Sequence, residues 1–267
     1  MLIDQNFVNS VRATIDSGYY ERHSIRRAEK KSLSEKIEKV NAEGHLPIII
    51  EIKCASPSDG QLFSSRHGAV SALSSLGSFM PAAFSAWVEP RLHAGDIKWL
   101  ARELPVPVLA KDFYISQKQF VGGDAVMLSM PLLLAANSNP HQLIDAAHDL
   151  GMEVVLEVYN DEQLAMAKKT EADIFAINNF GPNGSPANVA TTLALLSSNQ
   201  TGRPVISMEG ISEPEHVREL IKCGATAVEV GPKVWAGEFA ASHLEQLERA
   251  VYGREPANPL GEIKKVS

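Results

Sequence analysis

The stretch PIIIEIKCASPSDG, residues 47–60, gives the first indication of the fold of this chain. It begins with the short continuous apolar run PIII at 47–50, reaches Glu51 and then becomes mostly polar, ending on a glycine. A continuous apolar run of this kind is typical of a strand that is buried on both faces, as in a parallel sheet. We therefore expect residues 47–51 to form the first strand of a parallel sheet.

Runs of the same kind recur along the rest of the chain. They lie at 82–88, 106–110, 125–128, 153–158, 174–178, 204–207 and 227–230.

Segments with helical periodicity lie between these runs, for example 161–169 and 213–223, the second of which is closed by Gly224. Such alternation predicts an α/β fold, a single (β/α)8 TIM barrel over residues 45–267, with an open doubly wound sheet as the alternative. No Gly-x-Gly-x-x-Gly motif follows the first run, which argues against a dinucleotide-binding fold.

Residues 1–44 are predicted to be an N-terminal helical extension packed near one end of the barrel. Their charge-rich part, 21–40, mixes acids with bases. This mixture favours a solvated helix face over a nucleic-acid-binding patch.

Composition narrows the class of protein. The chain has 267 residues, 45% of them hydrophobic, and a formal net charge of −7. It has two cysteines, which form neither a disulfide framework nor a zinc-ligand pattern, and no long apolar run or secretory signal is evident. We expect a cytoplasmic enzyme with no metal, no cofactor, no nucleic-acid partner and no membrane segment. Nothing in the pattern specifies an oligomeric state.

Polar side chains gather at the ends of the predicted strands, where TIM barrels form their active sites. These residues are Glu51, Lys53, Trp87, Glu89, Lys111, Ser129, Glu157, Asn178, Glu209 and Gly231. Two lysines and four carboxylates would thus meet at one mouth, where burial and proximity push pKa values apart and favour acid–base chemistry.

Two glycines follow the last two predicted strands, Gly210 and Gly231. Backbone N–H groups at this pair of strands often bind a substrate phosphate in TIM barrels. The same glycines are also compatible with ordinary turns.

These motifs resemble those of the indole-3-glycerol-phosphate synthase family, whose first-strand signature is P-x-I-x-E-x-K-x-x-S-P-S-x-G. The resemblance covers about residues 45–235 and continues through FSAWVEPRLHAGDIKWL, VLAKDFYIS, GMEVVLEVYNDEQL, FAINN, ISMEGISEPEHVREL and GATAVEVG. It implies a carboxy-lyase of tryptophan biosynthesis. The substrate would be a small phosphorylated aromatic amine, a carboxyphenylamino-deoxyribulose phosphate, which undergoes ring closure, decarboxylation and dehydration.

The resemblance also implies catalytic roles. Lys111 matches the general acid that protonates the substrate carbonyl, and Glu157 matches the carboxylate that assists dehydration. Lys53 matches a second lysine that acts as an acid or holds the substrate carboxylate, and Glu51 the carboxylate that orients it. We expect burial beside Lys53 to lower the pKa of Lys111, and substitution of Lys111 to cost little stability because it lies at the mouth.

The implied substrate-binding residues include three that would line the pocket: Ser56, Phe113 and Asn178. Phe113 is also compatible with a core aromatic. Glu209, Gly210 and Gly231 complete the expected binding set.

Three positions depart from the family pattern. Met208 stands where the family usually has a glutamate, which places the carboxylate one residue later at Glu209. Phe180 replaces an arginine, so a bidentate contact to an anion is lost. Pro232 lacks the N–H that would extend a phosphate-binding loop, and only Lys233 beside it offers charge.

Three alternatives to a synthase therefore stay open. One is a diverged paralog, a lyase or cyclase with a different, less anionic substrate. Another is a non-catalytic barrel that binds a phosphorylated ligand. The third is an aldolase that forms a Schiff base through Lys111.

Overall fold

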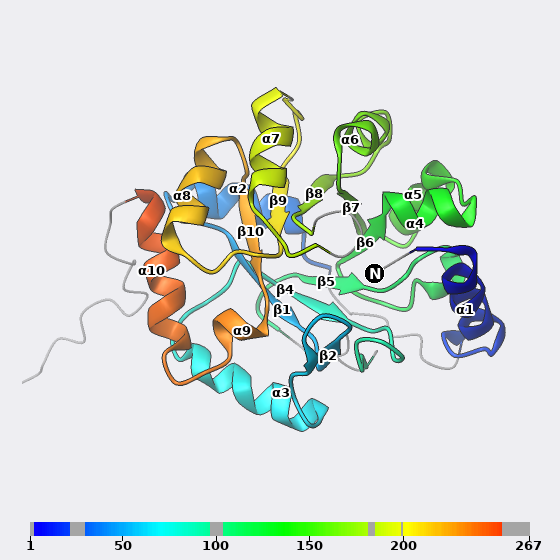
Figure 1. The fold of residues 1–267 in the computed structure, drawn as a ribbon, viewed down its shortest axis with the longest axis horizontal. Coiled ribbons are helices and arrows are strands. Elements are labelled where there is room, and N and C mark those ends of the chain that lie inside the picture. Colours follow the sequence, from blue (N-terminus) through cyan, green and yellow to red (C-terminus); the bar gives the residue numbers. More distant parts are fainter. Residues whose placement is uncertain (1–2, 22–29, 97–103, 181–184, 199, 253–267) are drawn as a thin grey trace, which may run out of the picture.

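The structure, a computed structural model, describes residues 3–21, 30–96, 104–180, 185–198 and 200–252 of the chain. In this part of the chain eight parallel strands close into a barrel in the order β1-β10-β9-β8-β7-β6-β5-β4 (Figure 1). The barrel strands are β1 Ile48–Ile52, β4 Ala83–Trp87, β5 Val108–Lys111, β6 Ala125–Ser129, β7 Glu153–Val158, β8 Ile174–Asn178, β9 Val205–Met208 and β10 Ala227–Val230. Each predicted strand is present, with its ends shifted by at most two residues, and the TIM barrel is confirmed.

Helices follow most strands and surround the barrel (Figure 1). They are α1 Gln5–Asp16, α2 Leu33–Ala42, α3 Arg66–Ala72, α4 Met130–Ala136, α5 Pro140–Asp149, α6 Asp161–Ala167, α7 Ala190–Ser198, α8 Pro214–Lys222, α9 Pro232–Trp235 and α10 Ala240–Tyr252. Shorter elements are the antiparallel pair β2 Ala55–Ser56 and β3 Gly60–Gln61 and the 3-10 helices η2 Leu73–Leu76 and η4 Gln117–Gln119. Only η4 lies between β5 and β6, so this unit lacks an α-helix.

Side-chain alternation along each strand divides the core into two layers. On β1, Ile48, Ile50 and Ile52 pack with the surrounding helices, whereas Ile49 packs inside the barrel. Successive strand residues point to opposite faces, so Glu51 shares the inward side with Ile49. The inward apolar residues fill the half of the barrel where the strands begin. The inward polar residues that follow them occupy the mouth, where the strands end.

Helix α2 closes the end of the barrel where the strands begin. Its Leu33 and Ile37 are fully buried against inward-facing strand residues. The side chain of Glu153, the first residue of β7, accepts a hydrogen bond from the backbone N–H of Ser34 at 3.2 Å. Asn41 donates to the carbonyl of Thr226, just before β10, at 2.9 Å.

Helix α1 lies at the other end, beside α4 (Figure 1). Phe7 of α1 packs edge-on against Phe113, with ring centroids 4.8 Å apart, and Arg12 donates to the carbonyl of Ala136 at 3.1 Å. The two N-terminal helices thus contact opposite ends of the barrel, and the expectation that they pack near one end is wrong. Each helix has its own apolar face, and the two faces pack against different ends of the barrel. The domain boundary at residue 44 stays a prediction.

Candidate active site

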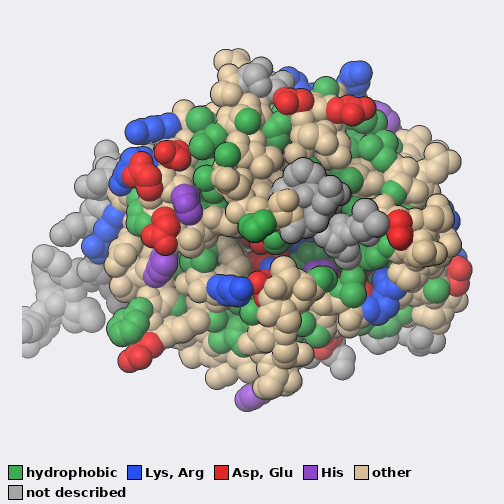
Figure 2. Space-filling view, in the orientation of Figure 1, with side chains coloured by type: hydrophobic (Ala, Val, Ile, Leu, Met, Phe, Trp, Pro, Cys, Tyr) green, Lys and Arg blue, Asp and Glu red, His purple; other side chains and the backbone are tan. Residues whose placement is uncertain are grey.

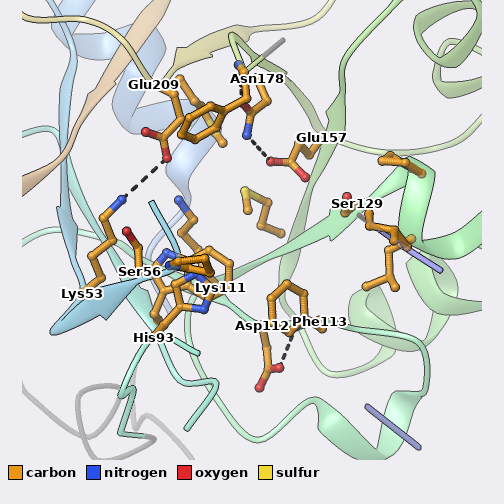
Figure 3. A pocket seen from close by; sticks show the side chains of 18 of the residues that line it. Lys53, Ser56, His93, Lys111, Asp112, Phe113, Ser129, Glu157, Asn178 and Glu209 are labelled. Carbon is orange, nitrogen blue, oxygen red and sulfur yellow. Dashed lines mark hydrogen bonds and ion pairs between the residues drawn. The ribbon is translucent and has the colours of Figure 1, made fainter. Parts of the chain in front are cut away.

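A cavity of about 520 Å³ opens at the carboxyl ends of the strands. Charged side chains lie within the hollow near the centre of the face shown in Figure 2. Seven residues assigned to the site from the sequence line this cavity: Lys53, Ser56, Lys111, Phe113, Glu157, Asn178 and Glu209. Lys111 and Glu157 therefore face the same space, as the catalytic hypothesis requires (Figure 3).

Two lysines and two carboxylates form a buried ion-pair network on one side of the cavity. Glu51 binds both lysines: its Oε2 lies 2.8 Å from Nζ of Lys53 and its Oε1 lies 2.6 Å from Nζ of Lys111. Nζ of Lys111 also lies 2.7 Å from Oε1 of Glu229 on β10. The indole N–H of Trp87 donates to Oε1 of Glu51 at 2.8 Å. Glu51 thus lies behind the lysines and orients them.

The network fixes the charge on each group. Burial alone would lower the pKa of Lys111, but Glu229 and Glu51 outweigh burial and raise it above its ordinary value. The expectation of a lowered pKa is wrong, because carboxylates rather than Lys53 dominate the surroundings. Burial opposes ionisation of Glu51, yet the two ammonium groups outweigh it and lower its pKa. Burial raises the pKa of Glu229, with Glu51 adding to the effect, although Lys111 opposes it.

The second expected carboxylate, Glu157, stands across the cavity. Asn178 on the neighbouring strand donates from Nδ2 to its Oε1 at 2.8 Å (Figure 3). Tyr159 lines the same wall, where burial and then the charge of Glu157 raise the pKa of its phenol. The hydrogen bond from Asn178 holds the Glu157 carboxylate toward the cavity.

Glu209 reaches the cavity although it follows the last residue of β9. Its φ of 68° is left-handed, a conformation uncommon for a residue other than glycine. The turn brings its Oε1 to 3.7 Å from Nζ of Lys53, while Met208 lines the cavity from the strand itself. The displaced carboxylate is thus returned to the mouth by local backbone geometry. Burial raises its pKa to about 7, and the charge of Glu51 adds to this effect.

Aromatic rings form the wall next to Lys111. Trp87 and His93 stack with ring centroids 3.5 Å apart, and Phe113 lies 5.6 Å from both. Phe180 also lines the cavity. Burial lowers the pKa of His93 in spite of the nearby Glu89 carboxylate, so this wall carries little positive charge. Such a surface suits a flat aromatic ligand.

Ser56 lies at the rim next to an acidic side chain. Its hydroxyl donates to Oδ2 of Asp59 at 2.8 Å, and Oδ1 of Asp59 lies 2.6 Å from Nζ of Lys233. The ammonium group of Lys233 is therefore paired with the carboxylate of Asp59.

The two glycines expected to bind phosphate do not line the described cavity. A Cβ built at Gly231 would lie 3.4 Å from Oε2 of Glu51, so this glycine packs directly on the ion-pair network. Gly210 has a φ of 71° and approaches the backbone of Ala187. Pro232 is buried at the first position of α9. The phosphate-binding role of Gly210 and Gly231 stays a prediction.

Sequence reasoning missed four polar residues of the site. Glu229 lies inside a strand rather than at its end, and a single carboxylate in the apolar run AVEV was the signal for it. His93, Asp112 and Tyr159 line the cavity from loops or from the end of a strand. Conversely, Glu89 does not line the described cavity: it accepts backbone hydrogen bonds from residues 91–93, so the set of four converging carboxylates contains Glu229 in its place.

Among the described residues, no group of three or more His, Cys, Asp or Glu side chains is arranged to hold a metal ion. Within the same residues, no helix is both long and apolar enough to span a bilayer.

The fold and the cavity at the carboxyl ends of its strands define a TIM-barrel enzyme. A family model described as indole-3-glycerol phosphate synthase matches residues 5–247. The chain belongs to the indole-3-glycerol phosphate synthase family. Indole-3-glycerol phosphate synthase of Dichelobacter nodosus is 31% identical over 218 residues, which are 79% of this chain and 80% of the relative. The protein of the same name from Bordetella pertussis is 32% identical over 216 residues, 79% and 82% of the two chains.

Solved structures show the same fold at lower identity. An archaeal fructose 1,6-bisphosphate aldolase is 16% identical, with a TM-score of 0.56 over 84% of this chain and all (100%) of the other. The N-acetylmannosamine-6-phosphate 2-epimerase of Clostridium perfringens is also 16% identical, with a TM-score of 0.54 over 78% and 93%. At this identity the likeness concerns the fold alone.

Proposed function

We propose that this protein is an indole-3-glycerol-phosphate synthase that converts a carboxyphenylamino-deoxyribulose phosphate by ring closure, decarboxylation and dehydration. One observation carries the proposal: a buried ammonium, Lys111, and a carboxylate, Glu157, face each other across one cavity with an aromatic wall. Ring closure needs an acid at the carbonyl oxygen, and dehydration needs a second group to move a proton. Membership of the family supports the assignment.

In the first step the aromatic carbon that bears the carboxylate attacks the ketone carbon. A ring π pair, pushed by the lone pair of the amine nitrogen, forms the carbon–carbon bond and leaves an iminium, while the carbonyl π electrons move to oxygen, which takes a proton from Lys111. The raised pKa keeps Lys111 protonated at neutral pH, so its proton is available to the more basic alkoxide as that oxyanion forms. The ammonium charge also stabilises the developing oxyanion within the buried site.

Loss of carbon dioxide then returns an electron pair to the ring system. The hydroxyl formed in the first step takes a proton from the Lys53 ammonium and leaves as water, and Glu157 accepts the C–H proton that must be removed to complete the indole. Lys53, at the mouth opposite Glu157, is the cation that would hold the substrate carboxylate or phosphate. We place the enzyme in the cytoplasm, where this pathway's small metabolites are found.

The test is a direct assay. Purified protein is incubated with the carboxyphenylamino-deoxyribulose phosphate, and indole fluorescence is followed. We expect turnover on the order of 1 s⁻¹ or more, and a loss of about 10²–10⁴-fold in the Lys111→Met variant. The exposed Lys118→Met serves as the matched control and should retain wild-type rates. Absence of product with the wild-type protein would overturn the assignment.

A second candidate is a diverged cyclase or lyase with a less anionic substrate. Phe180 lines the cavity, and the two lysines that line it already have carboxylate partners. Installing the family pattern as Phe180→Arg with Met208→Glu and Glu209→Ser should then raise turnover of the family substrate above that of the wild type. If the wild type is already fast and the triple variant is no faster, this second candidate is eliminated.

A further inference from the structure

Glu229 is a buried carboxylate in the middle of the site that the proposed reaction has not used. It lies on β10, is 3% exposed, and contacts Lys111 at 2.7 Å. β10 is not adjacent to β5, since β1 and β4 stand between them in the barrel. The Lys111 side chain therefore crosses the barrel interior to reach Glu229.

Glu51 alone would leave the ammonium less constrained. That carboxylate also binds Lys53 and the indole N–H of Trp87, so it is shared between three donors. Glu229 provides a second anchor from a different strand. An ammonium has three N–H donors, and the two carboxylates take two of them, so one is left to face the cavity.

We propose that Glu229 is a positioning residue that holds the Lys111 ammonium across the barrel, with one N–H directed at the substrate carbonyl. It also keeps Lys111 from acting as a free amine nucleophile. A lysine clamped in this way donates a proton and does not form an imine, which separates this site from a Schiff-base aldolase. This inference rests on the proposed function only for the identity of the substrate carbonyl.

The charges around Lys111 support this role. The groups that face it come from four strands and the loops after them: Glu51 of β1, Lys53 directly after β1, Glu229 of β10, Glu209 after β9 and His93 after β4. The three carboxylates favour the ammonium form, whereas burial, Lys53 and any protonated His93 oppose it. Of the favourable groups, Glu229 contributes most to the raised pKa of Lys111.

Glu229→Gln is the decisive variant, because it keeps the size of the side chain and a hydrogen-bond acceptor but removes the charge. In this variant kcat/KM should begin to fall at high pH earlier than in the wild type, because Lys111 loses its proton more readily. The apparent pKa of that fall should be lower by about one to two units, as expected for loss of one strong charged contact. The variant should also lose activity through a lower kcat and not through a changed KM. This loss should be smaller than the roughly 10²–10⁴-fold loss expected when Lys111 itself is removed. Glu229→Asp should recover part of the wild-type profile.

A second readout needs no turnover. Lys111 is reductively methylated with formaldehyde and cyanoborohydride at fixed pH, and its labelling rate is measured by peptide mass spectrometry. Labelling in Glu229→Gln should be faster than in the wild type by about tenfold for each unit by which the pKa falls. Asp124→Asn is the matched control: Asp124 is also buried and accepts a hydrogen bond from the backbone N–H of Val108, the first residue of β5, at the other end of the barrel. It should leave both the labelling rate and the pH profile unchanged.

Unchanged labelling and an unchanged pH profile in Glu229→Gln would overturn the positioning role. The labelling result stands even if the wild type does not turn over the family substrate, so failure of the proposed function and failure of this inference are distinguishable.

Discussion

Replacing Lys111 with methionine should destabilise the protein in a pH-dependent manner, in addition to removing activity. The ammonium is 1% exposed and lies within 2.7 Å of two carboxylates. After the substitution Glu51 keeps Lys53 and Trp87. Lys111 is, among the described residues, the one cation within ion-pair distance of Glu229, so Glu229 becomes a buried and uncompensated charge.

The size of the effect follows from the two ways in which the protein can respond. Leaving a buried charge without its partner costs about 3–5 kcal/mol. Protonating Glu229 instead costs about 1.36 kcal/mol for each pH unit above its ordinary pKa of about 4.3. The cost of protonation sets an upper limit on the destabilisation, which is about 5 kcal/mol at about pH 8 and about 1.6 kcal/mol at about pH 5.5. The folded-state pKa of Glu229 is raised in the variant, so the penalty is absent below about pH 4.3 and grows as the pH rises.

Urea denaturation at these two pH values measures the effect. With a slope of about 3 kcal/mol per molar urea, the midpoint should fall by about 1–1.6 M at the higher pH and by about 0.5 M or less at the lower pH. The double variant Lys111→Met with Glu229→Leu should regain much of the loss, because it leaves no unpaired charge at either position. A Lys111→Met variant within about 0.5 kcal/mol of wild type at the higher pH would refute the buried network. It would instead agree with the expectation from the sequence that substitution of Lys111 costs little stability.

Two further predictions concern the mouth and the floor of the barrel. Since the pKa of Glu209 is raised to about 7, the KM for an anionic substrate should rise as the pH increases through that value; Glu209→Gln should remove this dependence in steady-state assays. Ile37→Ala should lower the free energy of unfolding by about 2–5 kcal/mol, as for other buried large-to-small changes, and leave KM unchanged, because Ile37 closes the opposite end of the barrel. A changed KM in that variant would contradict the assignment of α2 to the floor.

The strands were predictable because a parallel barrel buries both faces of each strand and so leaves continuous apolar runs. The resemblance placed Lys53, Lys111 and Glu157, and strand ends alone had already suggested them. Glu229 was not found, because reading only the strand ends overlooks an inward polar residue within a strand.

Local pattern did not determine long-range contacts. The pKa of Lys111 was predicted to fall because Lys111 was expected to be buried beside Lys53 at the mouth, but Glu229 on another strand, together with Glu51, reverses the direction. Similarly, α1 and α2 are close in sequence yet contact opposite ends of the barrel. These outcomes depend on which strands the closed barrel brings together, and no local sequence signal specifies that.

The charge balance of the mouth connects the altered motif after β9 to substrate binding. Lys53 and Lys111 bring two positive charges, and the carboxylates of Glu51, Glu209 and Glu229 meet them at 2.6–3.7 Å. An anionic substrate must therefore compete with Glu209 for Lys53, and no guanidinium at position 180 can offset this competition. Glu209, with a pKa near 7, is the group that can yield by taking up a proton. Substrate binding near neutral pH should accordingly be accompanied by proton uptake, because the Glu209 carboxylate lies beside the cation that the substrate needs.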